Sequence, residues 1–374
     1  MTTGAGFSSK AVWKKEGDQS DYGTPIECGA NDQISIMTEG LDRTIEKELD
    51  NVVRHKAGVG GSNVMTKGVQ GSLVCDLAYR GLESLIISAM GFAAHSTSPE
   101  TIVAGVYKHT IELAENMHAE YWTAGDGILA GGGMLAGDKK VRRGTLCIDK
   151  SVSIWEFISS MAQEMTITGE AKGCKAEFAL VPYDLDRASA TNTTTAAWSI
   201  ANDDFDFVLF QDLDLWIADY SAVTPLDSGD AIGISALEIK LANILSVEQD
   251  SLSGLYIAEP KRDGKRRVTG SFTMPRYESD AFMEDLDDQS EKMAMIRFTG
   301  SQIGATGYYQ TFWIWLPTIK FDKIDAPIGG PGIFPVTHTF TAELPAAAPA
   351  GFPIEATKEM VIQIQNDNST NPLA

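Results

Sequence analysis

The sequence is poor in the residue patterns that carry catalysis or hold metals. It contains four cysteines and five histidines in 374 residues, and none of them has the spacing of a zinc site. It has no Gly-x-Ser-x-Gly elbow, no phosphate-binding Gly-Lys-Ser/Thr loop and no His-Glu-x-x-His helix. These absences predict a protein that is not an enzyme and that uses no cofactor or metal.

Long apolar runs are missing as well. No stretch approaches the roughly 20 residues that cross a membrane, and the N-terminus lacks the apolar segment of a signal peptide. We therefore expect no membrane partner and surroundings like the cytosol. In such surroundings the cysteines are expected to be reduced and buried.

Basic residues are scarce relative to acidic ones. Thirty Lys and Arg oppose 51 Asp and Glu, which gives a formal net charge of −21. Such a surface repels phosphates, which argues against tight binding of nucleic acid. Double-stranded DNA remains compatible as a transient passenger, because a channel in which a polyanion slides must lack the cations that would hold it.

Three segments suggest functional sites that their details weaken. The glycines of 125–137 do not have Gly-x-Gly-x-x-Gly spacing, which favours a loop over a phosphate site. Asp212 and Asp214 could open a calcium loop, but Ile217 occupies the position that needs glycine. The acidic residues of 284–288 could supply paired carboxylates for glycoside hydrolysis, and a solvated surface is the simpler interpretation.

Most of the chain has the period-two alternation of β-strands. Residues 34–50 alternate, with Leu41 and Ile45 on one parity and acidic residues on the other, and 68–79 form a half-buried return strand. The fold class is therefore predicted to be mainly β, with short helices at 80–90 and 279–286. Further strands are predicted at 164–168, 172–183, 292–299, 308–321 and 335–343.

The connection between the first two strands is long for a hairpin and still carries apolar side chains. Hairpin loops usually have about 2 to 5 residues, whereas this connection spans 51–67. Long connections of this kind are often functional, so we predict an arm that docks onto a neighbouring ring, with a surface loop as the alternative. The predicted arm residues are Val52, Val53, Val59, Val64 and Met65.

The second half of the chain repeats this arrangement. Residues 232–249 alternate, a connection follows, and 266–277 form the return strand. The two return strands share a Val-x-Gly-Ser pattern, which places Gly71 and Gly270 at equivalent positions. Glycine within a strand marks a bulge or a close approach of another backbone. The repetition predicts a tandem duplication.

The predicted organisation has five parts. A final alternating run at 360–365 predicts one more strand, formed within this chain or added to a neighbouring subunit. The parts are an N-terminal arm (1–30), a first domain (31–187), a linker with an acidic edge segment (188–230), a second domain (231–344) and a C-terminal extension (345–374).

Several of these segments together resemble the major tail tube proteins of long-tailed bacteriophages, the siphoviruses. In the first half the resemblance rests on Thr24-Pro25, on 34–48, and on Val69-x-Gly71-Ser72 leading through Tyr79-Arg80-Gly81 into an apolar helix. In the second half it rests on 235–245 and on Val268-x-Gly270-Ser271-Phe272-Thr273. Residues 96–137 fall outside the resemblance.

That family implies two tandem β-sandwich or barrel domains, each with a flanking helix and a long hairpin arm. Three such chains would form a ring with pseudo-six-fold symmetry, and a hexamer of a single fold with large insertions is the alternative. Stacked rings would enclose a channel for double-stranded DNA in the virion tail, assembled in the host bacterial cytoplasm. The implied partners are further copies of the chain, the tape measure protein, and the tail terminator and distal tail proteins.

The acidic parity of the first strand suits the wall of such a channel. If that strand faces the channel, Asp42, Glu46, Glu48 and Asp50 would repel phosphates and let DNA pass. Two alternatives remain open: an inner-tube subunit of a contractile secretion system, which shares the tube fold, and a capsid decoration or adhesion module. The latter does not explain the paired long connections.

Overall fold

The computed structural model is mainly β, as the alternation predicted. The glycine-rich segment at 125–137 lies outside the part of the chain that the structure describes. The described residues are 10–16, 22–29, 32–49, 62–93, 99–113, 120–122, 139–141, 143–171, 173–198, 206–247, 255–277, 279–326 and 334–369.

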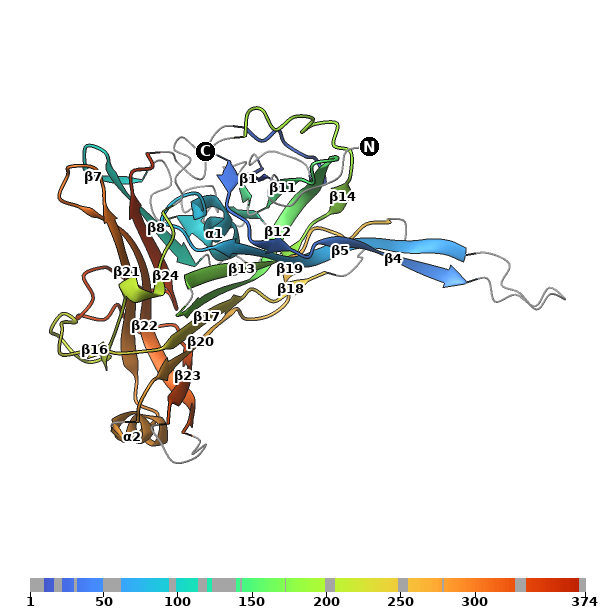
Figure 1. Cartoon of the computed structure of the whole chain (residues 1–374). Helices are drawn as coiled ribbons and strands as arrows, with labels where there is room; N and C mark the ends of the chain where they lie inside the picture. The colour runs from blue at the N-terminus through green and yellow to red at the C-terminus, as the bar shows by residue number, and fades with distance from the viewer. Residues whose placement is uncertain are drawn as a thin grey trace, which may run out of the picture.

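A continuous antiparallel sheet, here called the main sheet, runs through both halves of the chain (Figure 1). Its strands lie in the order β5–β13–β12–β17–β20–β23. Strand β12 of the first half is therefore hydrogen-bonded directly to β17 of the second half. These strands are β5 (Ser62–Asp76), β12 (Ile154–Glu170), β13 (Gly173–Val181), β17 (Ala236–Ala242), β20 (Arg267–Met274) and β23 (Val336–Ala342).

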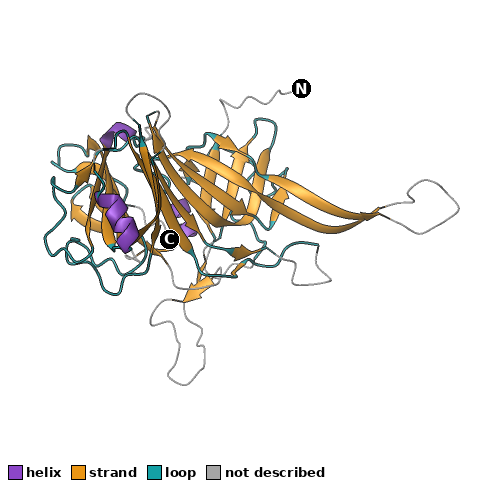
Figure 2. Ribbon diagram, turned by 90° about the horizontal axis from the view of Figure 1, so that it is seen from below, coloured by secondary structure: helices purple, strands orange, loops and turns teal. Residues whose placement is uncertain are grey.

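Further strands pair with the two ends of the main sheet. At one end β3 (Thr38–Glu39) and β4 (Asp42–Leu49) both pair with β5. At the other end β22 (Tyr309–Asp325) pairs with β23. The β4–β5 hairpin continues beyond the body of the molecule as a projecting arm, seen from two sides in Figures 1 and 2.

Each of the two longest strands connects the main sheet to a further group of strands. The first part of β12 pairs with β11 (Gly144–Asp149) and β14 (Asp184–Asp186), and its last part pairs with β13 and β17. Likewise, the first part of β22 pairs with β21 (Lys292–Gln302) and β24 (Val361–Asn366), and its last part with β23. Each of these strands has 17 residues, enough to pair both within the main sheet and within its own further group.

The remaining strands extend these two groups or lie in the connections. β1 (Ala11–Lys15) pairs with β11, and β15 (Leu213–Asp219) pairs with β21. The others are β2 (Gln33–Ile34), β6 (Gly91–Ala93), β7 (Glu100–Val103), β8 (Val106–Leu113), β9 (Glu120–Trp122), β10 (Lys139–Val141), β16 (Ala231–Ile232), β18 (Leu245–Ser246) and β19 (Lys261–Arg262), with a 3₁₀ turn at Phe210–Asp212.

The order and register of pairing agree between the two halves. In the first half Ala11 of β1 lies opposite both Ile34 and Ile148. In the second half Leu215 of β15 lies opposite both Ile232 and Ile296. Strand β15 falls within the predicted linker at 188–230, and the boundaries of that linker stay a prediction.

Each half carries one helix after its return strand, which confirms the two predicted helices. In α1 (Glu83–Met90) seven residues are buried, and the helix contacts β1, β6, β8 and β12. In α2 (Ala281–Asp288) no residue is buried, and the helix contacts β22. Neither helix of the described chain is long and apolar enough to cross a membrane.

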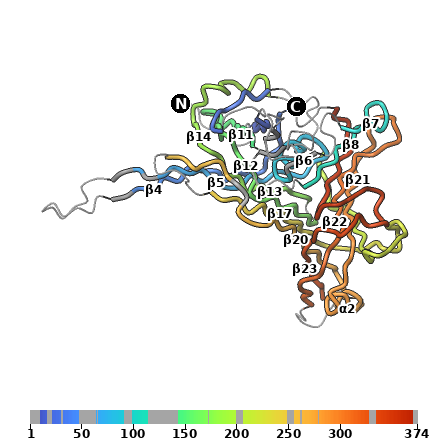
Figure 3. The backbone as a smooth tube through the Cα atoms, turned by 180° about the vertical axis from the view of Figure 1, so that it is seen from behind, coloured from blue at the N-terminus to red at the C-terminus, as the bar shows by residue number. Residues whose placement is uncertain are grey.

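The apolar core extends through both halves without interruption. Leu73 and Phe178 from the first half belong to the same cluster of buried side chains as Phe272 and Phe340 from the second. Burying apolar surface contributes about 25 cal/mol per Å², so this shared core holds the two halves together. The view from behind in Figure 3 shows β13, β17, β20 and β23 following one another across the halves.

Two features of the structure refine the predicted elements. Strand β5 begins at Ser62, so the end of the connection predicted at 51–67 is wrong: residues 62–67 continue the strand because they pair with β4. The predicted final strand at 360–365 is confirmed as β24, and it pairs within its own chain, between β22 and β8.

Candidate channel and assembly surfaces

The main sheet has one apolar face and one polar face. A row of buried residues crosses the apolar face: Cys75, Ala176, Ile167, Ile239, Gly270 and Phe340. The residues on either side of this row point to the opposite face, because side chains alternate along a strand. None of them is buried, so that face is open to solvent.

The polar face consists of two adjoining rows of mainly hydroxyl and charged side chains. Because Asp76, Glu177 and Glu238 oppose only Lys175 and Lys240 in these rows, the face offers no band of positive charge to hold phosphates. The first row is Val74, Glu177, Thr166, Lys240, Thr269 and Thr341, and the second is Asp76, Lys175, Thr168, Glu238, Ser271 and Thr339.

A hydrogen bond and an ion pair join neighbouring strands on this face. Thr273 and Thr337, on neighbouring strands, share a hydrogen bond of 3.0 Å between their hydroxyl oxygens. Lys240 of β17 pairs with Glu164 of β12, at 2.7 Å between Nζ and Oε1. That pair joins the two halves of the chain across the polar face.

The predicted channel residues lie along β4 and beyond it. Asp42 and Glu46 lie opposite Gln70 and Thr66 of β5. Gln70 and Thr66 are an even number of residues from Val74 of the polar face, so Asp42 and Glu46 point to that side of the sheet. Asp42 pairs with Arg187 at 2.9 Å, and both side chains are more than half exposed. The side chain of Glu48 and all of Asp50 lie outside the described residues.

The predicted arm residues are mostly beyond the part of the chain that the structure describes. Val52, Val53 and Val59 fall in the gap between β4 and β5. Val64 lies on β5 with 40% of its surface exposed, and Met65 is its neighbour on that strand. An exposed valine on a projecting hairpin is available for contact with another molecule.

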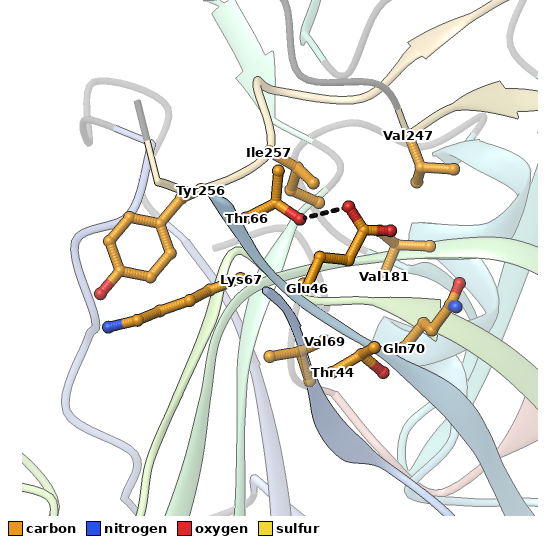
Figure 4. Close-up of a pocket in the computed structure, with 11 residues that line it drawn as sticks. Thr44, Glu46, Thr66, Lys67, Val69, Gln70, Val181, Val247, Tyr256 and Ile257 are labelled. Carbon is orange, nitrogen blue, oxygen red and sulfur yellow. Dashed lines mark hydrogen bonds between the residues drawn. The ribbon is translucent and has the colours of Figure 1, made fainter. Parts of the chain in front are cut away.

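The base of this arm meets the connection between β17 and β20 around a hollow of about 370 Å³ (Figure 4). Thr66 donates a hydrogen bond to Glu46 there, at 2.9 Å. The backbone N–H of Lys67 donates to the carbonyl of Leu255 at 2.7 Å, and the Lys67 ammonium lies 5.6 Å from the centre of the Tyr256 ring. These contacts join the two connections at one end of the main sheet.

The two motif glycines lie where another residue approaches closely. A Cβ atom built on Gly71 would lie 2.3 Å from the backbone oxygen of Gly40, in the adjoining strand connection. A Cβ atom on Gly270 would lie 2.4 Å from the Phe340 ring and 2.9 Å from the backbone oxygen of Glu238. Each return strand therefore needs the space that glycine leaves.

The two outer edges of the main sheet have no strand partner within the described chain. Strands β3 and β4 pair with β5 on one side only. The last residues of β22, from Lys320 to Asp325, pair with β23 on one side only. Unpaired edges of this kind readily accept a strand from another chain.

The described residues form no cluster of side chains that could hold a metal ion. No group of three His, Cys, Asp or Glu side chains gathers as a metal site requires, and the four cysteines are buried free thiols. Asp214 belongs to β15 and pairs with Arg297 at 2.8 Å, whereas the acidic cluster at 284–288 lies on α2. The calcium loop suggested by Asp212 and Asp214 is therefore not formed, and the acidic residues of α2 lie on a helix without a buried residue.

Sequence comparison identifies one family. Residues 8–342 match the family model described as Phage tail tube protein. No curated protein matches the chain.

Proposed function

The chain belongs to the phage tail tube protein family, and we propose that its copies close into rings that stack around a channel for double-stranded DNA. The family makes the chain a structural subunit of the phage tail tube. The observation that carries the rest is the polar face of the main sheet, which spans both halves without a break. A wall of this kind can surround DNA without binding it, because its charges are mixed and its acidic groups outnumber its basic ones.

We further propose that the chain is a tandem duplication and that three copies make one ring. The agreement of register, Ala11 with Ile34 and Ile148 against Leu215 with Ile232 and Ile296, supports two equivalent units. The β12–β17 pairing supports the ring, since it is a joint between equivalent units that can recur between chains. Each ring then has six units, as in the siphovirus tubes that the sequence resembles.

We propose that the rings stack through the β4–β5 arm and the β17–β20 connection. The β4–β5 hairpin and the β17–β20 connection leave the main sheet at the same end, which supports contacts with one neighbouring ring. Val52, Val53, Val59, Val64 and Met65 are the proposed contact residues, and the tape measure, terminator and distal tail proteins are the proposed further partners. Asp42, Glu46, Glu48 and Asp50 are proposed to extend the acidic lining of the channel.

Electron microscopy of the purified chain tests the assembly. We expect rings with a central channel and three-fold symmetry, with a mass near three times that of the 40.4 kDa chain. A ring of six chains would support the hexamer instead. Particles that remain monomeric at every concentration would contradict the proposal.

The channel wall is tested by reversing its charge. Replacing Glu177 and Glu238 with lysine should slow DNA ejection from assembled particles by about threefold or more, because the added ammonium groups bind passing phosphates. The matched control is Glu355→Lys, an exposed residue outside the main sheet. Equal ejection rates for all three particles would remove the polar face from the channel.

A further inference from the structure

The joint between the two halves is stabilised by an ion pair placed diagonally across two strands. Glu164 lies opposite Ala242, and Lys240 lies opposite Thr166, so Glu164 and Lys240 are offset by two residues along their strands. Their side chains nevertheless meet at 2.7 Å. Diagonal neighbours on one face of a sheet are within reach of long side chains.

The two unpaired edges of the main sheet carry residues at the positions equivalent to Glu164 and Lys240. The β12–β13 pairing has a bulge between Ala162 and Glu164, and the β22–β23 pairing has one between Phe321 and Lys323. Lys323 therefore stands where Glu164 stands in the first half.

The other edge gives the second member of the pair. Ile239 lies opposite Gly270, and Leu41 falls opposite Gly71 in the same register. Gly71 and Gly270 occupy equivalent places in the two return strands, so their partners Leu41 and Ile239 are equivalent as well. The residues that follow these partners, Asp42 and Lys240, are therefore also equivalent. Asp42 therefore stands where Lys240 stands in the second half.

We infer that Lys323 of one copy pairs with Asp42 of a second copy in the joint that closes the ring. This inference rests on the proposed function. The joint repeats the internal one with both charges exchanged: a base replaces Glu164, and an acid replaces Lys240. Both side chains are accessible in the single chain, with 66% of Lys323 and 73% of Asp42 exposed.

The groups already beside these residues make Lys323 the more important partner. In the single chain Lys323 pairs with Asp325 at 2.7 Å, and Asp42 pairs with Arg187. In the inferred register Asp325 lies directly opposite Asp42, where two carboxylates would repel one another. Lys323 would lie between them and offset this repulsion.

The two helices also support the placement of a second copy beside the unpaired end of β22. Helix α1 lies at the internal joint, where Asn243 of the second half donates a hydrogen bond to the carbonyl of Ala89 at 2.7 Å. Helix α2, beside the unpaired end of β22, has no buried residue. Phe282 and Leu286 of α2 pack only partly against the core. A second copy on this edge would cover α2 as the second half covers α1.

Exchanged charges also determine which edges can meet. If β4 of a second copy took the place of β17 beside β12, Asp42 would meet Glu164 and the two carboxylates would repel one another. If β17 were placed beside the end of β22, Lys240 would meet Lys323 and the two ammonium groups would repel one another. Each edge therefore favours the partner that the tandem order supplies. Repulsion against a wrong partner is a common source of specificity in assembly.

Charge reversal at the two positions tests the pair. Lys323→Glu places three carboxylates at the joint, and we expect the concentration for half-assembly of rings to rise about tenfold or more. Adding Asp42→Lys to Lys323→Glu restores opposite charges, and assembly should return to within about threefold of the wild type. The matched control is Lys175→Glu, the same change on the same face within an interior strand. Mass photometry measures the ring fraction.

Each outcome decides between the two levels of the proposal. Rings formed by Lys323→Glu at the wild-type concentration would overturn the ion pair and leave the proposed function standing. A double variant as defective as Lys323→Glu alone would overturn the pairing of these two residues. A wild-type chain that forms no ring would overturn the proposed function together with this joint. Circular dichroism of each variant confirms that it is folded.

Discussion

Replacing Arg143 with methionine is expected to destabilise the folded chain by about 3 to 5 kcal/mol, because it leaves a carboxylate buried without its cation. Arg143 and Glu16 are 1% and 0% exposed, and the guanidinium Nε donates to Glu16 Oε2 at 2.7 Å. Arg143 also pairs with Glu259 of the second half. Ser159 donates to the remaining Glu16 oxygen at 2.8 Å, which cannot replace the lost charge.

Urea denaturation measures this effect, and its pH dependence identifies the cause. Burial already raises the pKa of Glu16, while Ser159 and Arg143 oppose that rise. Without Arg143 the folded-state pKa rises further, so the deficit should grow as pH increases through it and shrink as Glu16 takes up a proton in acid. Arg143→Met with Glu16→Gln should recover part of the loss.

The control for this experiment is an exposed ion pair. Arg187→Met removes the partner of Asp42 at the surface, where such pairs contribute about 1 kcal/mol or less. If Arg143→Met costs no more than Arg187→Met, the buried network does not stabilise the chain.

Replacing His338 with phenylalanine is expected to remove a loss of stability in acid of up to about 3 kcal/mol. His338 is 3% exposed and lies among the rings of Phe272, Phe282 and Phe321, with the nearest ring centre 4.8 Å away. Neither of its ring nitrogens has a hydrogen-bond partner among the described residues. Burial therefore lowers its pKa from 6.5 to about 4, and each unit corresponds to about 1.4 kcal/mol.

The sign follows from which state binds the proton. Below pH 6.5 the unfolded chain protonates this histidine, whereas the folded chain does so only near pH 4, so stability falls across that window as pH decreases. Phenylalanine suits the site, because Phe178 occupies the equivalent position in the first half, opposite Leu73 as His338 is opposite Phe272.

Comparing unfolding curves of the two proteins from pH 7 to pH 4 isolates the histidine. The buried carboxyls of Glu16 and Glu156 and the half-buried carboxyl of Asp32 have raised pKa values and act in the opposite direction, but they are present in both chains. Parallel pH profiles would show that His338 does not titrate as its surroundings require.

The parts of the fold that the sequence predicts well are strands with one solvent-exposed face. The runs at 68–79 and 266–277 alternate because β5 and β20 each present polar residues to the open face of the main sheet. Strand β12 was predicted only at 164–168, although it begins at Ile154. Its first part is covered on both sides, so it shows no alternation, and its pairing depends on residues far away in the sequence.

The assembly surfaces were less accessible to sequence reasoning. The acidic parity of 42–50 was visible, whereas the polar face emerges only when six strands are placed in register. No sequence pattern marks Lys323 as a contact residue, because its equivalence to Glu164 depends on matching bulges in β12 and β22. Extending the Val-x-Gly-Ser alignment outward from Gly71 and Gly270 is the signal that could have revealed the position of Asp42.

The position of β24 has a consequence for how the chain folds during synthesis. This last strand inserts between β22 and β8, and Asn366 donates hydrogen bonds of 2.7 Å to the Tyr79 carbonyl and to Glu83 at the start of α1. Because ribosomes release the N-terminal part first, the first half must wait for residues made almost 290 positions later. The edges of β8 and β22 that β24 will cover stay unpaired on the nascent chain until β24 has been synthesised, and during that time they can pair prematurely with other nascent copies.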